Sequence, residues 1–448
     1  MPARLIESLA TTGPLADLFS DDSLLQAMLD FEAALARAEA RSGIVPKAAA
    51  EAIAAAAKAG NFDAASLSSE TLRAGTPGIP LVNALTAKVR AANPDAARYV
   101  HWGATSQDVA DTALILLLKK SQPILAADLS RLEAALRKLS DAHEHTVMLG
   151  RSLMQAAPPV TFGLKAAGWF AAIRRSRARL DAAFAESLVL QFGGSTGTLA
   201  ALGTDGLAVG RAMAGELGLG FPDAPWHAHR DRLGALVAAC GVLTGSLGKM
   251  ARDISLLMQS EVAEAAEPGG EGRGGSSTMP HKRNPVASSL ALAAANRVPG
   301  LVAAFLSGMV QEHERGVGGW QAEWPTVSAV IQATGLAAAS MAEAAGGLDV
   351  NKARMREDID ATRGAIFAER AMMLLGAALG RDVAYKLLEE ATRKSTAQQR
   401  RLAEVLAETP EVSKVLDSKA LRDLETPEGY LGVADALRKR LLSPDAKD

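Results

Sequence analysis

The segment 275–285 concentrates residue types that could carry out proton transfer next to a carboxylate. It contains two adjacent serines, Ser276 and Ser277, a fixed cation, Lys282, and an amide donor, Asn284. Nearby donors can lower the pKa of a serine hydroxyl enough for proton exchange, and they can hold a carboxylate whose charge grows during a reaction. On composition alone, the same segment is equally typical of a solvated loop between helices.

Other short motifs predict no site. The G-x-G-x-x-G string at 270–275 follows a predicted helix and lacks the strand of a dinucleotide-binding unit. The G-x-S-x-G string at 193–197 lacks the strand and helix that flank a nucleophile elbow. The histidine pairs at 143–145 and 227–229 have no third ligand at a recognisable spacing, so we expect no metal.

Long helices are expected to position these residues. Apolar side chains between Leu233 and Leu257 alternate spacings of three and four, which predicts a helix with a heptad seam. Similar runs are expected at about 111–145, 162–188, 286–305 and 326–348. No alternating stretch is long enough to predict a sheet. We therefore predict an all-α fold, an elongated long-helix bundle at 111–350 with smaller helical domains at 1–110 and 351–448.

Composition supports a soluble, helical, oligomeric protein. Hydrophobic residues make up 48% of the 448 residues and aromatic residues only 4%, which favours helices over sheets. A net charge of −2 gives no attraction to nucleic acid or to an anionic membrane, and one cysteine fits the cytoplasm. The strongly apolar cluster at 113–118 is too short to span a bilayer, and no signal peptide is evident. Helices that are apolar on several faces predict homo-oligomers.

Three motif regions resemble the fumarase/aspartase superfamily over nearly the whole chain. They are an H-x-G-x-T-S-x-D-x-x-D-T string at 101–112, the region 150–163, and the G-S-S-x-M-P-x-K-x-N-P string at 275–285. The resemblance implies a cofactor-free homotetramer with a twenty-helix core. It also implies active sites that each combine the three regions from three different subunits.

The resemblance assigns roles within these regions. Ser277, with Ser276 adjacent, would exchange a proton at the carbon α to a carboxylate, while Lys282 and Asn284 would hold that carboxylate. Further substrate contacts are expected from Thr105, Ser106, Gln107, Arg151, Gln155 and Arg315. His101 could assist or replace the serine, and it could equally be a structural hydrogen-bonding residue.

The second region departs from the lyases that expel an amine or hydroxide. Leu153 stands where those enzymes carry a histidine in a T-H-x-Q string, and Ala156 stands where adenylosuccinate lyases often carry another histidine. A poor leaving group needs a proton from a general acid, whereas a carboxylate, with a reference pKa of about 4, leaves without one. The departure favours a carboxylate as leaving group or nucleophile.

Strings at 190–200, 226–232 and 311–324 resemble the bacterial 3-carboxy-cis,cis-muconate cycloisomerases. This likeness implies lactone closure on a tricarboxylate substrate, with Arg315 pairing with a carboxylate. One alternative is a C–N lyase of the adenylosuccinate lyase kind that releases fumarate, which His101 favours and Leu153 opposes. The other is a structural protein on this fold, which the intact serine loop opposes.

Overall fold

The computed structural model describes residues 5–270, 274–275, 278–279 and 282–443. They form a mostly helical protein, as predicted, with the long helices α6 (Ser106–Ala142), α7 (Phe162–Ser187), α9 (Asp231–Leu257), α10 (Val286–Ser307) and α11 (Gly319–Gly346). Each predicted run coincides with one of these helices. The last begins earlier than expected, because the helix already starts within the glycine-rich string before Trp320.

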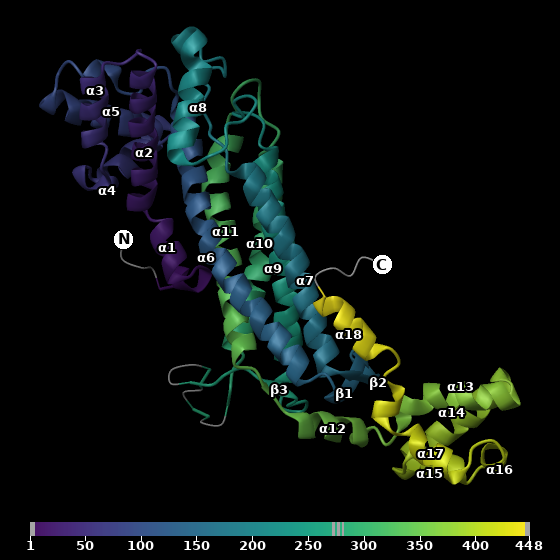
Figure 1. The fold of residues 1–448 in the computed structure, drawn as a ribbon. Coiled ribbons are helices and arrows are strands. Elements are labelled where there is room, and N and C mark those ends of the chain that lie inside the picture. Colours follow the sequence, from purple (N-terminus) through teal and green to yellow (C-terminus); the bar gives the residue numbers. More distant parts are fainter. Residues whose placement is uncertain (1–4, 271–273, 276–277, 280–281, 444–448) are drawn as a thin grey trace. The chain divides into compact units, whose positions relative to one another are not determined.

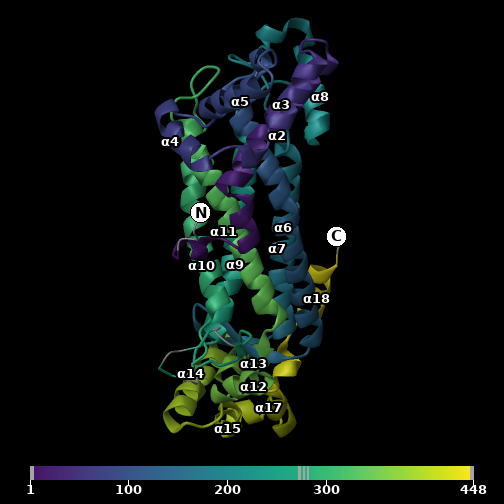
Figure 2. The ribbon, with the colours of Figure 1, turned by 90° about the vertical axis from the view of Figure 1, so that its left-hand side faces the viewer.

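The chain divides into two compact units. The first comprises 1–130, 175–248 and 290–340, and the second comprises 131–174, 249–289 and 341–448. The boundary lies within long helices, so it does not test the three predicted domains, which stay a prediction. Within the first unit, α6, α7, α9, α10 and α11 run side by side (Figures 1 and 2).

The first unit also contains a group of N-terminal helices, in which α2 packs against α3 and α8 (Figure 1). Ser20 caps α2 by accepting a hydrogen bond from the Ser23 backbone N–H at 3.3 Å, and Asp21 and Asp22 lie in the first turn, where the helix dipole favours them. The bounds are α1 (Gly13–Leu18), α2 (Asp21–Arg41), α3 (Lys47–Ala56), α4 (Ala64–Ala74), α5 (Gly78–Ala92) and α8 (Gly206–Leu217).

The second unit has its own core, built from the helices after α11 and from residues of β1 such as Val147 and Leu149. Its bounds are β1 (Val147–Ser152), β2 (Gln155–Thr161), β3 (Ala265–Ala266), β4 (Asp349–Val350), α12 (Lys352–Ala361), α13 (Ala368–Leu379), α14 (Arg381–Gln398), α15 (Leu402–Ala407), α16 (Pro410–Ser413), α17 (Ser418–Leu424) and α18 (Ala434–Leu442).

The heptad seam predicted between Leu233 and Leu257 is confirmed in α9, since all eight of its residues are buried, namely Leu233, Leu236, Cys240, Leu243, Leu247, Met250, Ile254 and Leu257. Glycine permits close helix contact along the same helix: a Cβ on Gly248 would lie 2.6 Å from the Cβ of Ala295 on α10. Small residues at such positions bring helix backbones together, and a larger side chain there would separate them.

The region of the second motif forms a β-hairpin, which corrects the expectation that no sheet is present. Strands β1 and β2 pair antiparallel, with Ser152 opposite Gln155 and a two-residue turn at Leu153 and Met154. Both turn residues have left-handed φ values, 50° and 66°. The hairpin was missed because such turns usually carry Asn-Gly or Gly, and neither residue gives that signal.

Two helices, α9 and α10, are long and apolar enough to cross a membrane by length and composition alone. Both are longer than the strongly apolar cluster at 113–118, which is too short to span a bilayer. In α9, 61% of the apolar window is buried, as in a core helix of a soluble protein, whereas only 22% of the α10 window is buried. An apolar helix that its own chain leaves uncovered needs another apolar surface against it.

Candidate active site

The first motif and Arg315 meet at the start of α6. Arg315 donates hydrogen bonds to Thr105 Oγ1 at 2.8 Å, to Gln107 Oε1 at 3.1 Å and to Ser106 Oγ at 3.5 Å. Among the residues that the structure describes, no carboxylate lies within ion-pair distance of this guanidinium. A half-buried cation beside hydroxyl groups and a helix N-terminus is well suited to bind a carboxylate from outside.

A buried ionic network lies directly behind this cluster. Arg230 forms two hydrogen bonds with Asp111, at 2.8 and 3.0 Å, and approaches Glu323 to 2.6 Å. Asp111 also accepts hydrogen bonds from Trp320 Nε1 and from the side-chain amide of Gln107. Although burial opposes ionisation, the Arg230 guanidinium holds the pKa of Asp111 below its usual range, while burial raises the pKa of Glu323. The network fixes Gln107, which in turn holds Arg315.

Asp108 organises the loop that carries the first motif. Its carboxylate is fully buried and accepts hydrogen bonds from the backbone N–H groups of Thr105, Gly193 and Gly194, at 2.9 to 3.0 Å. Nε2 of His227 lies 2.7 Å from the same carboxylate. Asp108 therefore joins the glycine string at 193–197 and His227 to the loop of the first motif.

His101 is held in an uncommon backbone conformation beside a buried carboxylate. Its φ is 60°, and its Nδ1 lies 2.6 Å from Oε1 of Glu32 on α2. Burial lowers the pKa of His101. The charges of Glu32 and Asp108 and the Glu32 hydrogen bond raise it by more than burial lowers it, so the pKa lies above its ordinary value. The imidazole is therefore favoured in its charged form.

The second unit contains Arg151 and Gln155 on the two strands of the hairpin. Arg151 lies 2.7 Å from the buried carboxylate of Glu264 and 3.7 Å from Asp358, so its charge is already compensated. Gln155 is exposed at the first position of β2. Leu153, at the hairpin tip, is 94% exposed, which places an apolar side chain where related lyases have an acid.

The described part of the serine loop turns back on itself. The backbone N–H of Asn284 donates to the Gly274 carbonyl at 2.8 Å, its side-chain amide donates to the Gly275 carbonyl at 3.4 Å, and Lys282 is exposed. Ser276 and Ser277, the predicted catalytic serines, lie outside the described residues.

Glu267 joins the loop to α10. Its carboxylate accepts hydrogen bonds from the first backbone N–H groups of the helix, those of Ala287 at 2.9 Å and Ser288 at 2.8 Å, while its carbonyl accepts one from Arg283. A charged cap of this kind stabilises a helix N-terminus and fixes the chain that enters it. The end of the serine loop is therefore anchored to α10.

Sequence reasoning did not identify Glu32, Glu323 or Lys165. Lys165, on α7, has no hydrogen bond or ion pair to another described residue, and burial together with Lys249 and Arg151 lowers its pKa although Asp253 and Glu264 oppose this. Glu32 and Glu323 are positioned by partners far away in the sequence, His101 and Arg230. A charged residue on the apolar face of a predicted helix was the only available signal.

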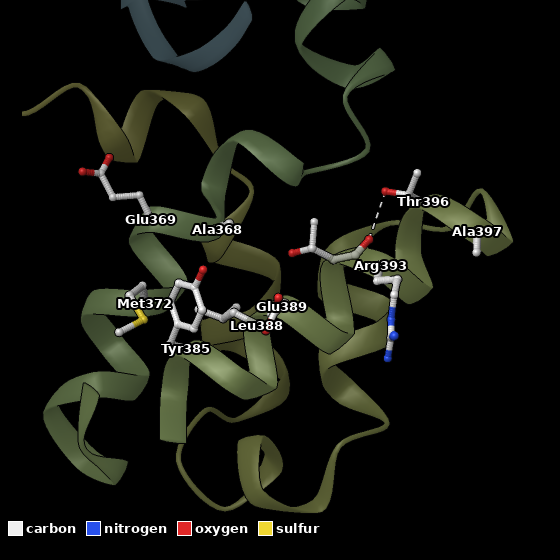
Figure 3. Close-up of a pocket in the computed structure, with 10 residues that line it drawn as sticks. Ala368, Glu369, Met372, Tyr385, Leu388, Glu389, Arg393, Thr396 and Ala397 are labelled. Carbon is white, nitrogen blue, oxygen red and sulfur yellow. Dashed lines mark hydrogen bonds between the residues drawn. The ribbon is translucent and has the colours of Figure 1, made fainter. Parts of the chain in front are cut away.

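A separate groove of about 710 Å³ lies between α13 and α14 in the second unit. Figure 3 shows Met372, Tyr385 and Leu388 close together, with Glu369 and Arg393 to either side of them. None of the predicted site residues lines it. Among the described residues, no group of three or more His, Cys, Asp or Glu side chains is arranged to hold a metal ion.

Comparison with known proteins shows which proteins this chain is similar to. A family model described as "Lyase" matches residues 8–300, and a model described as "Adenylosuccinate lyase C-terminus" matches residues 364–441. The 3-carboxy-cis,cis-muconate cycloisomerase of Bradyrhizobium diazoefficiens is 48% identical over 99% of this chain and 98% of its own length. That of Pseudomonas aeruginosa is 46% identical over 98% and 96%. The crystal structure of the Pseudomonas putida lactonizing enzyme superposes with a TM-score of 0.92, at 44% identity and with 98% of each chain covered.

Proposed function

The chain belongs to the fumarase/aspartase superfamily, and from this premise we propose that it catalyses the cycloisomerisation of 3-carboxy-cis,cis-muconate to 4-carboxymuconolactone. One substrate carboxylate oxygen adds to a conjugated C=C bond and forms the C–O bond of the lactone. The π electrons move toward a second carboxylate, and a proton then reaches the carbon α to it. The substrate supplies its own nucleophile, so the enzyme mainly orients it and stabilises the added charge.

The observation that carries this proposal in the structure is the uncompensated Arg315. It lies among Thr105, Ser106 and Gln107, without a carboxylate partner among the described residues. We assign it one substrate carboxylate, with Thr105 and Ser106 as hydrogen-bond donors to the same group. Gln107 already uses its amide on Asp111 and on the His227 carbonyl, so its role is to hold Arg315.

The remaining carboxylates are assigned to the second and third motif regions. Lys282 and Asn284 would grip the carboxylate that gains charge, and Ser277, with Ser276 beside it, would deliver the proton. Arg151 and Gln155 would contact the substrate from the hairpin, Arg151 more weakly because Glu264 compensates its charge. Leu153 provides no acid, as suits a carboxylate nucleophile.

We further propose a homotetramer whose active sites combine regions from different subunits, in a soluble protein of the cytoplasm. The support is the apolar helix α10, only 22% of whose apolar window is buried by its own chain. Contacts with the long helices of other subunits would cover this surface and bring the third motif region to the first.

The test is turnover of 3-carboxy-cis,cis-muconate by the purified protein, followed by the loss of diene absorbance. Ser277→Ala and Lys282→Ala should each lower kcat by about 100-fold or more, since both act on charge that develops in the transition state. Lys394→Ala, which removes an exposed lysine paired with Glu408, is the matched control and should keep full activity. Undiminished turnover in both loop variants would refute the mechanism.

The competing function is a C–N lyase that releases fumarate. The match of residues 364–441 to the adenylosuccinate lyase C-terminus model favours it, whereas Leu153 and Ala156 oppose it. Incubation with adenylosuccinate separates the two functions: fumarate release without loss of muconate absorbance would replace our proposal by this one.

A further inference from the structure

Glu32 is a buried carboxylate that contacts the loop of the first motif. Its side chain lies on α2 with an exposed fraction of 0%, and Oε1 lies 2.6 Å from Nδ1 of His101. Its other oxygen, Oε2, has no hydrogen-bond partner among the described residues. A buried carboxylate costs several kcal/mol unless it is paired, so the imidazole is the group that compensates Glu32.

The geometry of His101 leaves its second ring nitrogen available. Its left-handed φ of 60° costs about 1 kcal/mol or more for a residue other than glycine, and such strain is kept where the surrounding structure requires it. The side chain is 17% exposed, and no described residue forms a hydrogen bond with Nε2. Glu32 thus fixes the ring from the buried side, and Nε2 faces outward from α2.

The charged groups around the imidazole all favour its protonated form. Glu32 approaches from α2, and Asp108, itself paired with His227, acts from α6. Glu39 also lies on α2, and burial together with the charge of Glu32 raises its pKa to about 8, so that it is mostly neutral at pH 7. These contacts raise the net pKa of His101, in spite of its burial.

Lactone closure consumes one proton in each turnover, because the substrate carries three carboxylates and the product two. One carboxylate oxygen becomes part of the ester, and the α-carbon gains a C–H bond. The group that protonates this carbon must therefore regain a proton from solvent before the next turnover. A partly exposed imidazolium can supply that proton and recover it from water near neutral pH.

We propose that Glu32 is a positioning residue that holds His101 as the proton-bearing cation of the active site, with Nε2 toward the substrate. This inference rests on the proposed cycloisomerase function. The Nε2–H bond breaks as its proton passes to the group that protonates the α-carbon, and the neutral imidazole then takes a proton from water. Glu32 keeps its contact with Nδ1 throughout and stabilises the imidazolium.

The first test is the pH dependence of kcat/KM, which reports groups of the free enzyme. Glu32→Gln should move the alkaline limb to lower pH by about one unit or more and lower kcat/KM about tenfold at pH 8, since one pKa unit corresponds to a tenfold change. Glu32→Asp, which keeps the charge, should leave the alkaline limb close to its position in the unmodified enzyme. A structural role would lower activity equally at every pH.

Glu39→Gln is the matched control, because it removes a carboxyl from the same helix with the same burial and no contact with His101. Its alkaline limb should match that of the unmodified enzyme. If Glu39→Gln removes the limb and Glu32→Gln does not, Glu39 is the titrating group and our proposal is wrong.

The second test follows His101 directly and needs no substrate. In protein labelled with ¹³C at histidine Cε1, His101→Gln assigns the resonance, and Glu32→Gln should lower its titration midpoint by about one unit or more. An unchanged midpoint refutes the Glu32–His101 pairing. Absence of muconate turnover by the unmodified enzyme would instead refute the proposed function, so the two failures are distinguishable.

Discussion

The groups that hold Arg315 are neutral, so its charge is left for a substrate carboxylate. Its affinity for that carboxylate also depends on how the planar guanidinium presents its N–H donors. Three donors are directed by Thr105, Ser106 and Gln107. A lysine would keep the charge but lose the planar fork. Replacement of Arg315 by lysine therefore tests the geometry of the guanidinium separately from its charge.

Arg315→Lys should raise KM for the tricarboxylate about 10-fold, and Arg315→Gln about 100-fold, as expected for lost hydrogen bonds to a charged group. Steady-state kinetics measures both. Arg356→Lys, at an exposed ion pair with Glu428, is the control and should leave KM unchanged. An unchanged KM in Arg315→Lys would show that the fork geometry does not matter.

Substitution of Leu153 tests whether the group that leaves or attacks is a carboxylate. It is almost fully exposed at the hairpin tip. Because a carboxylate leaves without a proton, Leu153→His should not accelerate lactone opening or closure by more than about threefold over the matched polar variant Leu153→Asn. Rates in both directions provide the measurement. A much larger gain with histidine would mean that the reaction does require a general acid at this position.

At the scale of elements, α2 carries two buried carboxyl groups on one face, Glu32 and Glu39. The carboxyl oxygens of Glu39 have no hydrogen-bond partner among the described residues, and burial followed by the charge of Glu32 raises its pKa to about 8. Its folded-state pKa thus lies above the unfolded value near 4.5. The stability that the protonated Glu39 contributes to the folded state is fully present below about pH 4.5 and is lost as the pH rises toward 8.

Glu39→Gln, which cannot ionise, should therefore flatten the fall of melting temperature between pH 5 and 8. At pH 8 it should be more stable than the unmodified protein, by on the order of a few kcal/mol. Thermal melts across this range test the prediction. Glu51→Gln, at an exposed position of α3, should follow the unmodified protein. A parallel curve for Glu39→Gln would show that Glu39 is ionised in the folded state.

The long helices could be predicted from the sequence because their seam repeats locally, as in α9. The hairpin could not, because its left-handed turn is made by Leu153 and Met154, which carry no turn signal. The motifs predicted which residues gather around Arg315. Glu32 was missed because its contact with His101 joins residues 69 positions apart, and no local pattern encodes such a contact.

At the scale of the whole molecule, α10 is the element that a single chain explains least. It follows the serine loop directly, and Glu267 fixes its first turn. Its apolar surface is mostly uncovered within the chain. Assembly of four chains would bury this surface and carry the anchored loop to another subunit. Sedimentation should therefore give a mass of four times the chain mass of 46.5 kDa.

Shared active sites make a sharper prediction than the mass alone. At substrate concentrations far below KM, Arg315→Gln disables the site at the first motif region and Lys282→Ala disables it at the third. If a site takes these regions from different subunits, mixed tetramers contain sites with neither substitution, in about one site of four for random assembly of equal amounts. Co-expression of the two variants should then restore about a quarter of the activity, although each alone is nearly inactive. The double variant co-expressed with unmodified chain is the control, since in it, too, only sites built wholly from unmodified regions are active. If both regions came from one chain, every site of the first mixture would contain a substitution, and the mixture would remain as inactive as its components.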